Sequence, residues 1–372
     1  MRFLLFLVVP CLVFAARAQA QVIEAGPIVV KLGGRVNYQF NTTSVDDEDL
    51  QDDGLAAAIP ASTFEMRRLR LRTQVAFEDW LTGEVEVDFG GGRVQLRNAF
   101  ANYAIAPALQ IRAGHFKKPF SLLQLTSSSV YPVIERGVRI RGLAEALQVE
   151  DQPDPVLQPF AIGEEQDLLD RFRYQSFDLG AEVHGGAGRF DYAVGVFNGA
   201  GGDRLGETDD KAFAGRGRIA ITENGPLIVG LGVSRAVFRD GSSANDEATG
   251  VAWEADLEWG QFRRPGIHVL AEIASGDNVL AEDATFLGAQ GVVAWFQPVD
   301  AGRVEGWEIA GRVSYGDPSR NKNGDAGLLL TPGVNLYFFG RNRLMLNWDF
   351  YMPESDRFND EHAFRAQAQI YF

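Results

Sequence analysis

Apolar and polar residues alternate with a period of two along most of the chain after residue 20. Between residues 30 and 40, for example, Val36 and Tyr38 share one phase, whereas Asn37 and Gln39 take the other. Successive side chains of a β-strand point to opposite faces, so this alternation predicts a strand with one apolar and one polar face. The pattern recurs in sixteen segments, near residues 29–40, 66–78, 81–90, 93–105, 108–116, 174–184, 188–198, 211–222, 226–238, 249–260, 265–275, 286–297, 305–315, 328–338, 342–352 and 362–372.

The connections between these segments fall into two length classes. Short ones, such as residues 78–80 and 340–341, alternate with long polar ones, such as residues 41–63 and 199–210. Short turns at one end and longer loops at the other are typical of outer-membrane barrels. No apolar run after residue 20 approaches the ~18 residues of a spanning helix, and no linker divides the chain, so we expect one domain over residues 21–372.

Strands with one apolar and one polar face fit two architectures. In a soluble sandwich the apolar faces pack together, whereas in a membrane barrel they meet lipid and the polar faces line a lumen. The polar phase carries full charges, and five tryptophans lie in the apolar phase, as in aromatic girdles at a membrane interface. They are Trp253, Trp259, Trp295, Trp307 and Trp348. We therefore predict an all-β fold, a transmembrane antiparallel β-barrel of about 16 strands.

Residues 1–20 have the features of a secretory signal peptide. Arg2 gives a positive start, residues 3–14 are apolar, and Ala18-Gln19-Ala20 offers a small-x-small cleavage site. A retained anchor is the alternative, but the apolar run is short of the ~20 residues needed to span a bilayer. The only cysteine, Cys11, lies in this segment, so the mature chain would lack disulfides and thiolate metal sites.

The net charge further restricts the function. The formal charge is -15 at pH 7, which argues against nucleic acid as a partner, because binding to phosphates needs a basic surface. The four histidines are scattered, with no metal-ligand spacing, and no cofactor motif stands out. Ser127–Ser129 with His115 is the one set that a hydrolase could use, and we expect no enzyme.

Three motifs resemble the phosphate-selective porin O and P family. Residues 114–137 read GHFKKPFSLLQLTSSSVYPVIERG, close to that family's Gly-x-Phe-Lys-x-Pro-Phe-Ser, Leu-Thr-Ser-Ser and Glu-Arg pattern. Residues 64–72, FEMRRLRLR, match its Arg-rich second strand, and residues 96–100, LRNAF, are similar to its Leu-Arg-Asp-Ala-Tyr segment. The chain departs from the pattern at Leu123 and Gln124, where an acidic residue is common.

The resemblance implies a trimeric, sixteen-stranded porin in the bacterial outer membrane, surrounded by lipid, with a folded-in third loop and arginines that conduct anions. On this basis we expect a water-filled channel for passive diffusion of small anions such as phosphate or related oxyanions. A general diffusion porin with little ion selectivity is the alternative.

The residues themselves suggest where anions would bind. Arg68, Arg70 and Arg72 alternate on one strand, so they share one face at ~7 Å steps. An arginine keeps its charge and grips oxyanions with a planar fork, so such a ladder would attract anions. The basic wall is extended by Lys31, Arg35, Arg93, Arg97 and Arg112. Cross-strand ion pairs with Glu84, Glu86 and Asp88 are an equally good interpretation of the same ladder.

Residues 117–173 are too long for a plain hairpin loop and contain no clean strand. We expect them to fold into the lumen as the constriction, with several cations at its narrowest point. These are Lys117, Lys118, Arg136, Arg139 and Arg141. The alternative is a surface loop whose acidic residues face water.

Overall fold

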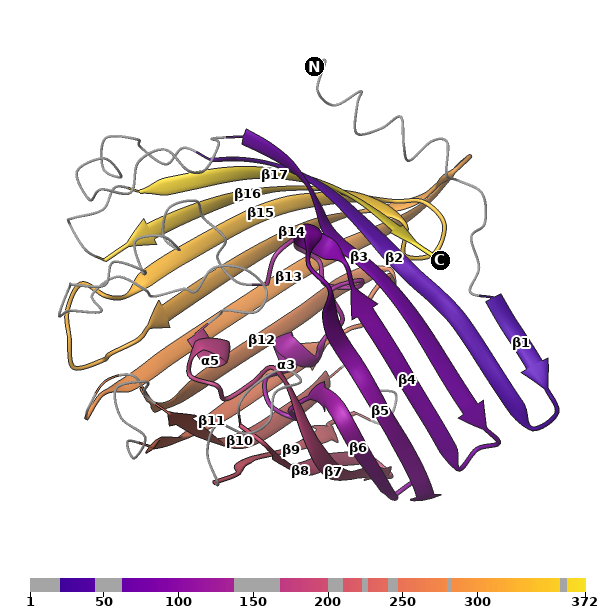
Figure 1. The fold of residues 1–372 in the computed structure, drawn as a ribbon. Helices are drawn as coiled ribbons and strands as arrows, with labels where there is room; N and C mark the ends of the chain where they lie inside the picture. Colours follow the sequence, from indigo (N-terminus) through magenta and orange to yellow (C-terminus); the bar gives the residue numbers. More distant parts are fainter. Residues whose placement is uncertain are drawn as a thin grey trace.

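The alternating segments form sixteen antiparallel strands that close into one barrel, with a further short strand at its edge (Figure 1). The computed structural model describes residues 21–43, 62–136, 168–199, 210–222, 227–239, 247–279, 281, 283–354 and 360–372. The predicted signal peptide, residues 1–20, lies outside them. The fold class predicted from the sequence is confirmed.

The strands follow one another around the barrel in chain order. They are β2 (Ile28–Thr43), β3 (Ser62–Phe77), β4 (Leu81–Asp88), β5 (Gln95–Ala106), β6 (Leu109–Lys117), β7 (Phe177–Ala187), β8 (Phe190–Phe197), β9 (Ala212–Ala220), β10 (Leu227–Arg239), β11 (Glu247–Trp259), β12 (Gly266–Asp277), β13 (Thr285–Ala301), β14 (Val304–Asp317), β15 (Gly327–Tyr337), β16 (Arg343–Pro353) and β17 (Glu361–Tyr371). β17 pairs with β2, with Gln367 opposite Gln39, and this pairing closes the barrel. All sixteen predicted segments correspond to these strands.

The sequence pattern did not reveal the short strand β1 (Gln21–Ala25). Gly26, with φ 62°, turns the chain so that β1 runs back along residues 28–32 of β2. β17 pairs only with residues 35–43 of the same edge. β1 thus covers the part of the β2 edge that β17 leaves unpaired, which protects an otherwise open sheet edge.

Burial of the two faces is the reverse of that in a soluble protein. Large apolar side chains of one phase are exposed, as for Leu231 (67%) and Trp253 (48%), whereas polar side chains of the other phase are buried, as for Glu254 (1%). Because β11 lies in a closed barrel, the exposed phase faces outward and the buried phase inward. A barrel that is apolar outside and polar inside spans a membrane.

Part of the long segment after β6 packs against the inward-facing side chains of the strands. It includes two short helices, α3 (Leu122–Leu125) and α5 (Leu168–Arg171), and α3 contacts β12 (Figure 1). Phe172 and Tyr174 pack on the inward-facing Phe286 of β13, with ring centroids 5.2 and 5.7 Å apart. The rest of the segment, including Arg139 and Arg141, lies outside the described residues.

The apolar cluster around these rings is possible because the neighbouring strands present small residues. Five alanines of β9 to β12 are buried in it: Ala212, Ala214, Ala236, Ala252 and Ala274. Where the segment packs, the inward-facing positions of these strands therefore carry small residues instead of polar ones. None of the helices among the described residues is long and apolar enough to cross a membrane.

Candidate functional site

A cavity of about 360 Å³ lies between the first strands of the barrel and the segment after β6. Seven of the cations predicted from the sequence line it: Lys31, Arg35, Arg70, Arg72, Arg112, Lys117 and Arg136. Two carboxylates, those of Glu84 and Glu86, line it as well. The structure therefore gathers most of the predicted basic residues around one space, and cations outnumber anions there.

A second cavity, of about 620 Å³, lies next to the short turns near Pro107 and Gly186. Arg112, Lys117 and Leu125 line both cavities. The two cavities therefore adjoin each other at these three side chains, two of which are cations.

The arginine ladder is present, but it is paired with carboxylates. The register of β3 and β4 places Arg70 opposite Asp88 and Arg72 opposite Glu86. Arg70 Nε lies 2.5 Å from Asp88 Oδ2, and Arg72 Nη2 lies 2.9 Å from Glu86 Oε2. The alternative of cross-strand ion pairs is thus what the geometry shows. The side chain of Arg72 keeps 33% of its surface exposed, so it can still meet an anion.

Four other predicted cations among the described residues do not line this cavity, and one of them, Arg93, is exposed just before β5. Arg68 is buried and lies 3.4 Å from the Glu135 carboxylate. Arg97 is buried beside Asp88, at 3.6 Å. Lys118 is buried at the base of the long segment.

Lys118 connects the two ends of that segment. Its ammonium donates to the Arg173 carbonyl at 2.5 Å and lies 3.9 Å from Asp178, and its backbone N–H donates to the Ser176 carbonyl. Burial lowers the pKa of the Lys118 ammonium, an effect that the nearby Asp178 opposes. These contacts suit a structural clamp better than a site for a passing anion.

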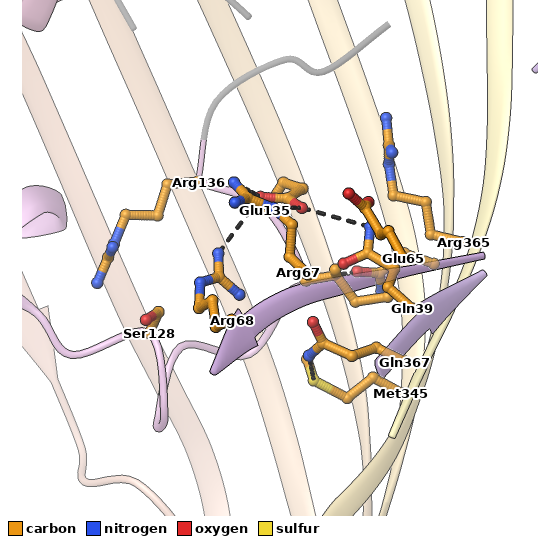
Figure 2. A network of polar contacts seen from close by, with 12 residues as sticks. Gln39, Glu65, Arg67, Arg68, Ser128, Glu135, Arg136, Met345, Arg365 and Gln367 are labelled. Carbon is orange, nitrogen blue, oxygen red and sulfur yellow. Dashed lines mark hydrogen bonds and ion pairs between the residues drawn. The ribbon is translucent and has the colours of Figure 1, made fainter. Parts of the chain in front are cut away.

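Glu135 is the centre of a polar network between the segment and the barrel wall (Figure 2). Its carboxylate accepts hydrogen bonds from Arg67 at 2.8 and 3.1 Å, from Arg68 at 3.4 Å and from Gln39 at 3.3 Å. Arg136, the next residue, donates to the Thr126 carbonyl and lies over the Tyr131 ring. Glu135 thus pairs with two arginines of β3 and fixes the part of the chain that carries Arg136.

We name residues 118–136 the strap, because inward-facing side chains of β14 to β17 hold its backbone at several points. Arg312 donates to the Glu135 and Arg136 carbonyls at 2.7 and 2.8 Å. Further bonds join the strap to Asn335, Arg343, Asn347 and Gln369. The strap is therefore fixed to the wall formed by β14 to β17, next to β2 and β3, and its Ser127, Ser128, Ser129 and Arg136 line the cavity.

Three serines of the strap, Ser127, Ser128 and Ser129, line the cavity, whereas Ser121 is buried against Glu272. Ser127 and Ser129 share a hydrogen bond of 2.9 Å between their hydroxyls, while His115 stacks on Phe177 with ring centroids 5.7 Å apart. Ser128 is buried, and its hydroxyl has no hydrogen-bond partner among the described residues. Within the same residues, no group of three or more His, Cys, Asp and Glu side chains could hold a metal ion.

Several features of the site were missed in the sequence. Phe100 lies in the inward phase between Asn98 and Asn102, where an aromatic residue interrupts the polar pattern, and that interruption was a usable signal. Glu135 was noted only as part of the Glu-Arg motif. Its partners on β3 lie 67 and 68 residues away, and no local pattern indicates them.

Comparison with known sequences identifies the family. The family described as "Phosphate-selective porin O and P" matches residues 30–261, well over half of the chain. The chain belongs to this porin family. A comparison with curated protein sequences finds no match.

Solved structures with the same fold are distant in sequence. The outer membrane channel DcaP of Acinetobacter baumannii is 12% identical, with a TM-score of 0.60, and the match covers 95% of this porin and 100% of that chain. OprB of Pseudomonas putida is 11% identical, with a TM-score of 0.56 and coverage of 92% and 94%. The trimer form of OmpT, an outer membrane protein of Vibrio cholerae, is 15% identical, with a TM-score of 0.55 and coverage of 93% and 99%.

Family and fold together define the general role of the protein. It is an outer-membrane β-barrel porin, a channel for passive diffusion. Both indicate a channel rather than an enzyme.

Proposed function

We propose that this porin favours small anions, with phosphate-like oxyanions among them. The observation that carries the proposal is the cavity lining, where seven cations face two carboxylates. Charges of one sign at a narrow passage with low-dielectric walls raise the local concentration of counter-ions. The family's description as phosphate-selective supports the same assignment.

In this proposal the anion moves between several weak sites rather than binding at one. Lys31, Arg35 and Arg72 lie on β2 and β3, while Arg112, Lys117 and Arg136 lie on β6 and the strap. Arginine stays charged and binds oxyanions through its fork, and conduction needs sites weak enough for the ion to leave. The Ser128 hydroxyl can donate one further hydrogen bond.

A general diffusion porin remains the second candidate because of the ion pairs of the ladder. Arg70 and Arg72 each contact two carboxylates within 3.6 Å, among Glu84, Glu86 and Asp88. Paired arginines attract a mobile anion less strongly, since the neighbouring carboxylate repels it. The two candidate functions predict different ratios of anion to cation permeability, and this ratio can be measured.

Three further assignments belong to the same proposal. We assign residues 117–173 to the constriction, supported by the contacts of the strap with the wall. A homotrimer in outer-membrane lipid is supported by the trimer form of OmpT, which has a related fold. Cleavage after Ala20 is supported by the signal-peptide pattern.

The decisive experiment measures reversal potentials across a planar bilayer in a KCl gradient. The triple variant Lys31→Gln, Lys117→Gln, Arg136→Gln removes three cations of the cavity and should lower the anion to cation permeability ratio. A matched control, Arg189→Gln, Arg264→Gln, Arg303→Gln, removes three cations exposed at turns and should leave the ratio unchanged. Equal ratios in the two variants would refute the proposal.

A further inference from the structure

We infer that the passage selects organic anions with an apolar or aromatic body, such as arenecarboxylates, over small hydrophilic anions of equal charge. The inference rests on the proposed anion preference and names the class of anion that this lining suits best. Its basis is the mixture of cations and aromatic rings at the point where the two cavities meet.

The two cations at this point, Arg112 and Lys117, make cation–π contacts with phenyl rings. The guanidinium carbon of Arg112 lies 4.8 Å from the centroid of Phe100 and 5.4 Å from that of Phe116. The ammonium of Lys117 lies 5.5 Å from the centroid of Phe177. All five of these side chains line the cavity.

A ring partner affects a cation differently from a carboxylate partner. A phenyl face holds the cation in place by its quadrupole but adds no net negative charge. Arg112 also contacts Glu182 at 3.4 Å, yet 29% of its side-chain surface stays exposed. The cation therefore remains available to a mobile carboxylate, in a fixed position beside an apolar surface.

The apolar surface within reach of that carboxylate is only partly covered by protein. Phe100, Leu125 and Tyr371 all line the cavity and are half-buried, so each keeps accessible surface. Leu125 and Arg112 lie at the junction of the two cavities. An anion whose charged group meets Arg112 or Lys117 can thus place its apolar body on Phe100 or Leu125.

A hydrophilic anion gains nothing from these rings. Acetate or phosphate would lose part of its hydration beside them without compensation, whereas a phenyl body gains by leaving water. Burying roughly half of a phenyl ring corresponds to about a tenfold gain in affinity. Phe100 also packs against the apolar cluster, with its ring centroid 6.1 Å from that of Phe116, and the part of the ring that stays accessible is the surface offered to the anion.

The test uses the purified porin in planar bilayers, with block of the chloride current as the readout. Benzoate and acetate carry the same charge, so the ratio of their half-blocking concentrations isolates the apolar body. We expect benzoate to block at about tenfold lower concentration than acetate. Equal half-blocking concentrations on the unmodified protein would overturn the inference, whatever the variants do.

Variants of β5 locate the effect. Phe100→Asn, which matches its inward-facing neighbours, should bring benzoate close to acetate, whereas Phe100→Leu should retain part of the difference. Tyr103→Leu, which alters an outward-facing ring of the same strand, should leave it unchanged. A benzoate preference that survives in Phe100→Asn would contradict the site.

The outcomes separate this inference from the proposed function. A KCl reversal potential without anion preference would refute the proposed function itself. Anion preference together with equal block by benzoate and acetate would refute only the organic-anion inference. Formate, which carries the same single charge as benzoate, provides the second hydrophilic reference in the same assay.

Discussion

The inner faces of β2–β6 and of β9–β14 follow the same alternation of apolar and polar residues. The first face borders a cavity, whereas the second is covered by packed side chains. On β2–β6 the inward positions carry long charged side chains, and a cavity remains beside them. On β9–β14 several inward positions are alanines, and the rings of Phe120, Phe172 and Tyr174 fill the space in front of them. Alternation thus fixes which face is inward, whereas the size of the inward residues decides whether the lumen there is open or filled.

Packing on the filled side also fixes the position of the segment that borders the cavity on the open side. The segment after β6 is anchored by an apolar cluster over β9 to β13 and by charged contacts such as that of Arg312 on β14. A large apolar cluster inside a porin costs lumen width, but it holds the strap against the wall. Changes on the filled side should therefore alter pore size, and changes on the open side should alter ion preference.

The largest effect is expected for Phe172→Ala on the filled side. The ring is buried and packs on Phe286, so its loss should lower the free energy of unfolding by about 3–5 kcal/mol. The loosened segment should also widen the passage, which single-channel conductance would report as an increase. Phe213→Ala, on the outward face of β9, is the control and should leave conductance unchanged. Equal conductance in both variants would show that the ring does not hold the segment in place.

A smaller effect is expected for Glu135→Gln at the boundary of the two sides. The variant keeps the shape but loses the charge that Arg67 and Arg68 contact, with an expected cost of about 1.5–3 kcal/mol. The strap should become mobile, so current noise and brief closures should increase. Glu305→Gln, whose ion pair with Arg263 is half-exposed, should behave like the unmodified protein. A quiet channel in Glu135→Gln would mean that the backbone bonds of the strap suffice.

On the open side, Glu84→Gln with Glu86→Gln should raise the anion preference. The two amides keep hydrogen-bond acceptors for Asn98 and Arg72 but remove the charges that oppose a mobile anion. The reversal potential in a KCl gradient should move toward that of chloride. Asp300→Asn with Glu305→Gln, at the strand ends that flank the turn between β13 and β14, serves as the charge-matched control. A shift of equal size in the control would mean that overall charge, and not the cavity lining, sets the preference.

The strands could be predicted from the sequence because each depends on its own local pattern. The pattern could not show how an inward residue is paired across the lumen, which is why the Arg68 contact with Glu135 was missed. Nor could the pattern show which of two adjacent residues faces the cavity where the chain leaves a regular strand. Lys117 and Lys118 look alike in sequence, yet only the first lines the cavity, because the chain leaves the strand between them. β1 was missed because five residues are too few to establish a period.

These two lysines give the smallest and most specific test. Lys117→Gln should lower the anion preference with little change in stability, since the residue lines both cavities. Lys118→Gln should change stability and leave the anion preference intact, since its ammonium is buried against Arg173 and Asp178. Reversal potentials of both variants in one KCl gradient separate the two roles.

The buried Lys118 also predicts the direction in which the free energy of unfolding changes with pH. Burial lowers the pKa of Lys118 in the folded protein below its ordinary value of 10.5, so the unfolded chain binds the proton more tightly. Between these two pKa values the unfolded state carries the additional proton, and raising the pH therefore stabilises the folded state. Urea unfolding in detergent should show the free energy of unfolding of the unmodified protein rising with pH in this window, which ends near pH 10.5, relative to Lys118→Gln. A pH-independent difference would mean that Lys118 keeps its ordinary affinity for the proton and is not buried at the base of the segment.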